Sequence, residues 1–133
     1  MKRGQSLVEL AVCAPVVMLL AIGAVATVQV IDAHAGLEAA TQAAAAEAAR
    51  APDPASAAIA ARTRFDSMVA SYPLSSPGVS ISVGTFSRTD EVVATATGAV
   101  DMSWASLIFP RRLVLDFRAT VPLESWRTHR PSP

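Results

Sequence analysis

The chain opens with MKRGQSLVELAVCAPVVMLLAIGAVATVQVI, residues 1–31, and this stretch decides its architecture. Lys2 and Arg3 precede Gly4, and a single carboxylate, that of Glu9, stands five positions after the glycine. From Leu10 to Ile31 there is no charged side chain. As a helix rising ~1.5 Å per residue, this run is roughly 33 Å long, enough for a hydrocarbon core of about 30 Å. The sequence therefore predicts a transmembrane helix over residues 5–31.

The charges on the two sides of this helix differ in sign. Lys2 and Arg3 precede it, whereas the first charged residues after it are acidic: Asp32, Glu38 and Glu47. Basic residues are enriched on the cytoplasmic side of a membrane helix. The pattern predicts a single-pass protein of the cytoplasmic membrane, with its N-terminus inside and its C-terminal part outside. The lipid bilayer is thus the first expected partner.

The segment Arg3-Gly4-Gln5-Ser6-Leu7-Val8-Glu9-Leu10-Ala11, with Pro15 shortly after it, resembles the start of TadE/TadG-like proteins. These are type IV pilin-like pseudopilins of the tight-adherence (Flp) pilus system. The resemblance implies that residues 1–4 are a prepilin-type leader, removed between Gly4 and Gln5 by a prepilin peptidase. It also implies that Glu9 is required for processing and assembly. The resemblance covers about the first 50 residues.

The same resemblance implies the protein's partners and its role. Besides the peptidase, they are other pilin and pseudopilin subunits and the tight-adherence assembly machinery, with incorporation into a surface pilus as one outcome. Major Flp pilins are little more than the helix. A chain with a further domain therefore favours a TadE-like minor pilin over the main filament subunit.

Glu9 has a physical interpretation of its own. A carboxylate costs a few kcal/mol at mid-bilayer and less near an interface. If cleavage frees an α-amino group on Gln5, the Glu9 of a neighbouring subunit could pair with it and offset the cost of burial. Alternatively, Glu9 lies at the cytoplasmic headgroups and reaches back to water.

Two other interpretations of the leader remain open. Ala24-Val25-Ala26 resembles a secretory cleavage site before Thr27, although Glu9 interrupts the front of the apolar region and the run continues to Ile31. The chain could also be a signal-anchored envelope protein with a binding head and no filament role.

Composition bounds the rest of the chain. Its 133 residues leave room for one small domain after the membrane helix. Hydrophobic residues make up 52% of the chain but aromatic ones only 5%, so the core is expected to be thin. The formal charge is zero, and without Lys2 and Arg3 the 9 basic and 11 acidic side chains give −2. Neither balance favours a nucleic acid as partner. Cys13, the single cysteine, lies inside the predicted span and cannot staple the exported domain.

An alanine-rich stretch, residues 32–50, is expected to continue the helix outside the membrane, because alanine has the highest helix propensity. Such a helix suits close packing against neighbouring helices, as in a filament core or a pilin head, or it is a plain stalk with no partner. Pro15 is expected to kink the helix or to cost it a hydrogen bond, and Pro52 with Pro54 to end it. Residues 51–127 are expected to form a small extracytoplasmic α+β head, and residues 128–133 a disordered tail.

The head is predicted to hold a second short helix and an antiparallel sheet of about three strands. The helix runs from a cap at Ser56 to about Ser71, with Ile59, Phe65, Met68 and Val69 broadly on one face. Residues 75–78 are expected to form a turn. Alternating apolar residues predict strands over 79–84, 91–102 and 113–121, with a turn at 88–90 and a bulge at Gly98. This is also the general plan of pilin heads.

No catalytic constellation occurs in the sequence. His34 and His129 are far apart, and neither has a metal-ligating residue three or four positions away. We therefore expect a protein that is not an enzyme, with no metal, no cofactor and no small-molecule substrate. The candidate interface is the apolar loop before the last strand and the arginines after it: Trp104, Leu107, Ile108, Phe109, Arg111 and Arg112. Such residues suit a protein partner or a membrane surface. Alternatively, Trp104 and Phe109 fill the core.

Overall fold

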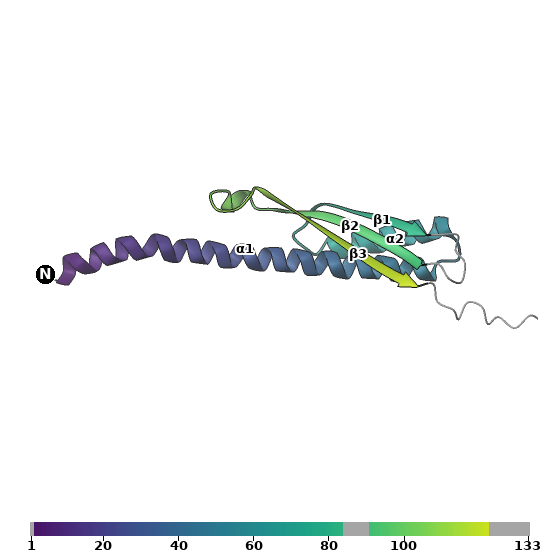
Figure 1. The fold of residues 1–133 in the computed structure, drawn as a ribbon, viewed down its shortest axis with the longest axis horizontal. Helices are drawn as coiled ribbons and strands as arrows, with labels where there is room; N and C mark the ends of the chain where they lie inside the picture. Colours follow the sequence, from purple (N-terminus) through teal and green to yellow (C-terminus); the bar gives the residue numbers. More distant parts are fainter. Residues whose placement is uncertain (1, 84–90, 123–133) are drawn as a thin grey trace, which may run out of the picture.

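The computed structural model describes residues 2–83 and 91–122. Over these residues the elements are two helices, three strands and one short 3-10 turn: α1 (Lys2–Arg50), α2 (Pro54–Val69), β1 (Ser75–Val83), β2 (Glu91–Asp101), η1 (Ser103–Ala105) and β3 (Arg112–Pro122). Figure 1 shows α1 as a long rod, with α2 and the sheet gathered along its C-terminal half. The predicted α+β class is confirmed. The predicted turn at 88–90 and the tail at 128–133 lie outside the described residues.

The helix α1 is continuous over 49 residues and passes through Pro15. Proline has no N–H to donate, so one backbone hydrogen bond is lost there, which membrane helices tolerate. Figure 1 shows a gentle bend in the N-terminal part of α1 and no break. The helix ends at Arg50, two residues before Pro52, as predicted.

The two halves of α1 differ in what covers them. Every described side chain from Arg3 to Ala21 is exposed. The C-terminal half buries a stripe at helical spacing, formed by Ala26, Ala33, Leu37, Ala40, Ala44 and Ala48. Small side chains in this stripe let α2, β2 and β3 approach the helix closely. The alanine tract therefore supports the protein's own head, and the interpretation as a plain stalk is wrong.

The start of α2 corrects the predicted cap. Asp53, and not Ser56, is the N-cap: its Oδ1 accepts a hydrogen bond from the Ser56 N–H at 2.9 Å. Pro54 follows as the first helical residue, where a missing N–H has no cost. The predicted apolar face is also partly wrong, because Ile59 is 70% exposed. The buried face repeats every four residues: Ala57, Ala61, Phe65 and Val69.

The three strands form one antiparallel sheet in the order β1-β2-β3. In β3, Leu113, Leu115, Phe117, Ala119 and Val121 point to the helices and the residues between them are exposed, so the predicted alternation is confirmed. The central strand β2 contributes Val92, Ala94 and Ala96 to the interior. The outer face is rich in Ser and Thr, as expected of an antiparallel sheet covered on one side.

The first strand begins four residues earlier than predicted. Residues 75–78 belong to β1, and an irregularity in register falls between Ser75 and Gly78. Ser76 there has a positive φ of 50°. The prediction of a bulge at Gly98 is thus wrong. Gly98, in β2, pairs regularly with Leu115, and the irregularity lies opposite it in β1. A Cβ at Gly98 would stand 2.9 Å from Leu74 Cδ2, so this glycine makes room for Leu74.

Candidate functional site

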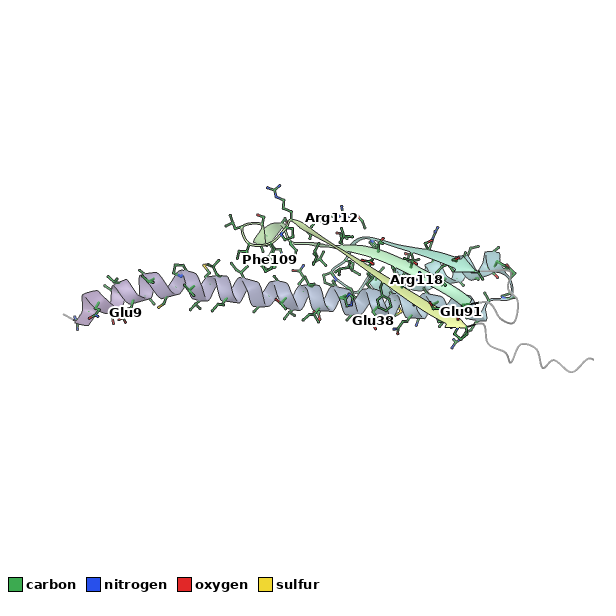
Figure 2. All side chains as sticks on the ribbon, viewed as in Figure 1. Glu9, Glu38, Glu91, Phe109, Arg112 and Arg118 are labelled. Carbon is green, nitrogen blue, oxygen red and sulfur yellow. The ribbon has the colours of Figure 1, made fainter. Side chains whose placement is uncertain are left out.

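The predicted processing residues lie in the first turns of α1 (Figure 2). Gly4, Gln5 and Glu9 are all exposed. A Cβ at Gly4 would have no neighbour within 4 Å. Gln5 and Glu9 are four residues apart, one above the other on the same face of the helix. Since helical side chains lean toward the N-terminus, the Glu9 carboxylate leans toward the end that cleavage after Gly4 would create.

Lys2 and Arg3, the basic residues predicted to set the membrane orientation, come directly before Gly4. Lys2 is the first residue of α1, and the Arg3 side chain is exposed. Among the residues that the structure describes, one helix, α1, is long and apolar enough to cross a membrane. Almost none of the most apolar part of this helix is buried by the rest of the protein. An N-terminal apolar helix of this kind is compatible with membrane anchoring, whereas the core helix of a soluble protein is mostly buried.

The candidate interface is an ordered loop, residues 102–111, between β2 and β3. Its ends are joined by a 2.9 Å hydrogen bond from the Met102 N–H to the Arg111 carbonyl. Inside it, the N–H groups of Ile108 and Phe109 both donate to the Ala105 carbonyl at 3.0 Å. The loop is therefore a compact structure of its own. We call residues 102–111 the β2–β3 loop.

An aspartate fixes the start of this loop. The Asp101 carboxylate accepts a hydrogen bond from the Ser103 N–H at 2.9 Å. Hydrogen bonds from Ser103 hold the pKa of Asp101 below its ordinary value, because they stabilise the charged form. This local bond positions the short turn η1, which carries Trp104.

The structure divides the six predicted interface residues into two groups. Phe109 turns toward α1 (Figure 2) and packs against a buried cluster that includes Ala26, Ala33 and Met102. Exposed residues make up the other group: Trp104, Leu107, Ile108, Arg111 and Arg112. Leu107 is 100% exposed and Trp104 48%. The alternative that both aromatic residues fill the core therefore holds for Phe109 and not for Trp104.

Sequence reasoning missed Gln29 as a partner of the loop. The Trp104 indole Nε1–H donates a hydrogen bond to Gln29 Oε1 at 3.2 Å, which joins residues 75 positions apart. Gln29 is the only amide side chain in the uncharged run from Leu10 to Ile31. An isolated polar side chain of this kind is the one signal in the sequence that could have indicated a polar partner. The pairing itself depends on the length of the β2–β3 hairpin, which spacing alone did not predict.

A cleft of about 280 Å³ opens between the β2–β3 loop and α1. Its walls are almost entirely apolar: Ala26, Thr27, Val30 and Ile31 from α1, and Met102, Phe109, Pro110 and Leu113 from the sheet and loop. No polar groups converge in this cleft, so its chemistry suits an apolar occupant and not a reaction.

His34 contacts an aromatic ring, and His129 lies outside the described residues. The His34 imidazole meets the Phe117 ring edge to face, with centroids 6.2 Å apart. Within residues 2–83 and 91–122, no three or more His, Cys, Asp or Glu residues gather where they could hold a metal ion.

Comparison with protein families matches residues 4–50 to the family described as TadE-like protein. The match begins at Gly4 and ends at Arg50, the last residue of α1. Neither the curated proteins nor the solved structures give a match to this chain. The resemblance predicted from the N-terminal sequence is confirmed over these residues. The N-terminal helix of this chain is therefore similar to that of TadE-like proteins, and the α+β head lies beyond the matched segment.

Proposed function

We propose that this protein is a TadE-like minor pilin or pseudopilin that acts in the assembly of a tight-adherence type IV pilus. One observation carries the proposal: the TadE-like match covers a helix whose N-terminal half is apolar and exposed on all sides. A surface of this kind needs lipid or other helices around it. The role is assembly without catalysis.

In this proposal residues 5–31 span the cytoplasmic membrane. Lys2 and Arg3 keep the N-terminus in the cytoplasm, and the head lies outside. The helix holds the subunit in the bilayer until it is passed to the assembly machinery. Other pilin and pseudopilin subunits then replace lipid around the same exposed residues, since membrane helices associate mainly through van der Waals packing.

Processing removes residues 1–4 after Gly4. Cleavage by the prepilin peptidase removes the basic side chains of Lys2 and Arg3 and leaves a cationic α-amino group on Gln5. The Glu9 carboxylate of a neighbouring subunit pairs with this cation in low dielectric and sets the register between subunits. The exposure of Gln5 and Glu9 on the first turns of α1 supports this pairing.

The packing of Ala26 supports a helix that stays intact at this residue, against release of the head by cleavage after it. Ala26 is 1% exposed and packs with Met102 and Val100 in the head. A mature N-terminus at Thr27 would remove this residue from the buried cluster and begin the chain beneath the β2–β3 loop.

Mass spectrometry of the N-terminal peptide, on membrane-associated protein made with the native peptidase present, tests the proposal. We expect the peptide to start at Gln5, with N-methylation as a further mark of pilin-type processing. A start at Met1 would contradict processing and leave a signal-anchored envelope protein with a binding head. A start at Thr27 would contradict the membrane anchor as well.

Glu9→Gln tests the role of the carboxylate, because it keeps the size of the side chain and removes its charge. We expect Glu9→Gln to lose association with other subunits in membrane extracts. Glu38→Gln, the same change farther along α1, is the matched control and should keep it. Equal association of the Glu9→Gln and wild-type chains would contradict the pairing.

A further inference from the structure

The β2–β3 loop lies along α1 on the side of the head that faces the N-terminus. Figure 1 shows the loop reaching back past the rest of the head alongside the helix. The hydrogen bond from Trp104 to Gln29 and the packing of Phe109 near Ala26 and Val30 fix it there. The loop therefore meets α1 within the last residues of the uncharged run.

This loop leaves large apolar side chains exposed. Leu107 is fully exposed, and Trp104 and Ile108 are 48% and 45% exposed. Exposed large apolar residues are ordinary when scattered, but three of them within five positions of one rigid loop form a patch. The backbone hydrogen bonds inside the loop show that this exposure belongs to a folded structure.

The β2–β3 loop lies beside the end of the uncharged run, whose helical length matches the thickness of the hydrocarbon core. A helix of roughly 33 Å from Leu10 ends at Ile31, which is where the outer edge of a hydrocarbon core of about 30 Å would lie. Ile31 also lines the cleft behind the loop. The loop thus lies at the depth where hydrocarbon gives way to headgroups. Its position along α1 depends on the β2–β3 hairpin and is independent of the length of the uncharged run.

The order of side chains along the loop matches this boundary. Trp is favoured at membrane interfaces because its ring is apolar and its N–H is polar. Arg111 and Arg112 follow the apolar residues, at the start of β3, and are exposed. Arginine binds phosphate through paired N–H donors. An apolar tip followed by two arginines is complementary to acyl chains beneath lipid phosphates.

We propose that the β2–β3 loop is a second membrane contact of this protein, seated in the phospholipid leaflet on the side of the head. Trp104, Leu107 and Ile108 lie at the boundary of headgroups and acyl chains, with Arg111 and Arg112 at lipid phosphates. The cleft between the loop and α1 is filled by acyl chain, because its apolar walls continue the exposed apolar surface of α1. The inference rests on the proposed membrane span of residues 5–31. Two contacts fix the depth and tilt of the head, where one helix alone would leave it free to tilt.

Tryptophan quenching in liposomes of phosphatidylethanolamine and phosphatidylglycerol tests this proposal with the full chain. The variant Trp126→Phe leaves Trp104 as the single tryptophan. The lipids carry bromine either close to the glycerol or close to the end of the acyl chain. We expect Trp104 to lose more fluorescence to the shallow bromine than to the deep one, and to be shielded from aqueous iodide.

Two variants on a Trp104→Phe, Trp126→Phe background provide matched controls. Leu20→Trp reports on the middle of the predicted span and should be quenched most by the deep bromine. Thr95→Trp, on the outer face of the sheet, should be quenched by iodide and by neither lipid.

The outcomes separate the two proposals. If Leu20→Trp is quenched by lipid while Trp104 is quenched only by iodide, the loop proposal is wrong and the membrane span stands. If Leu20→Trp is not quenched by lipid, both are wrong. If Trp104 is shielded from iodide only at high protein-to-lipid ratio, a second copy of the chain covers the loop, and this too overturns the proposal.

Discussion

The two halves of α1 have the same secondary structure and opposite surroundings. In the N-terminal half, large apolar side chains such as Leu10, Val16 and Leu20 point outward and are more than half exposed. In the C-terminal half, alanines are buried beneath α2 and the sheet. The size of the α1 side chains therefore differs between the part that the head covers and the part that it leaves exposed. The exposed half carries many large apolar residues where no other part of the described chain approaches, whereas the residues buried beneath the head are mostly alanines, with Leu37 as the large exception.

This contrast separates the α1 residues that stabilise the head from those that are exposed and available to partners. The head is anchored on residues 26–50 of α1, and all three of its buried clusters include α1 residues. The exposed half adds nothing to the packing of the head. In the proposed function, this half contacts lipid and other subunits.

The largest expected effect comes from the same truncation made in each half. Leu37 is fully buried in the main cluster, whereas Leu20 is 69% exposed. Leu37→Ala should lower the free energy of unfolding of the head by about 2–5 kcal/mol, because it removes buried surface and leaves a cavity. Leu20→Ala should leave this free energy unchanged. Urea unfolding of the full chain in detergent micelles, followed by near-ultraviolet circular dichroism, measures both. Equal losses would contradict the division of α1.

A smaller effect is expected from glycines in the two halves. A Cβ at Gly36 would collide with the Tyr72 ring, which lies against the helix, whereas one at Gly23 would have no neighbour within 4 Å. Gly36→Ala should cost about 1–3 kcal/mol through overpacking, despite the better helix propensity of alanine. Gly23→Ala should change head stability by less than about 0.5 kcal/mol. The same unfolding measurement applies, and a head that tolerates Gly36→Ala without loss would show that Tyr72 does not pack there.

The smallest expected effect is a dependence on acid that is confined to the head. Hydrogen bonds from Ser56 hold the pKa of Asp53 below its ordinary value of 3.8. A lowered folded pKa gives stability that is present above the unfolded pKa and is lost as pH falls through the folded value. Unfolding curves measured downward from pH 5 should therefore show the head weakening below about pH 4.

Asp53→Asn is the control for this acid effect. Asparagine keeps a capping oxygen for the Ser56 N–H but does not titrate. The variant should lose part of the weakening in acid while α2 stays folded at neutral pH. An unchanged pH profile in the variant would show that Asp53 does not contribute to it.

Much of the fold could be predicted because its signals are local. The uncharged run gives the helix, Pro52 and Pro54 give its end, and the alternation from Leu113 to Val121 gives β3. The errors occur where two local signals compete. Ser56 and Asp53 are both good caps, and Pro54 decides between them by fitting the first helical position. Residues 75–78 have the composition of a turn, yet pairing with β2 draws them into an irregular strand.

The candidate site could be predicted only in part. The six interface residues were recognisable by their types, but the split between Phe109 and Trp104 depends on how far the hairpin folds back over α1. Gln29 became a partner of Trp104 for the same reason. Contacts between residues 75 positions apart follow from sheet register and helix packing, which no local pattern in the sequence records.

The central claim is that the two halves of α1 lie in different solvents, and Cys13 tests it most directly. Its thiol is exposed on the N-terminal half and is the only one in the chain. Maleimide reacts with thiolate, which forms poorly in apolar surroundings. In intact membranes we expect Cys13 to resist a water-soluble maleimide and to react after detergent is added, whereas Thr95→Cys in a Cys13→Ser chain reacts at once from the outside. Rapid labelling of Cys13 without detergent would show that water surrounds the N-terminal half and would contradict the account.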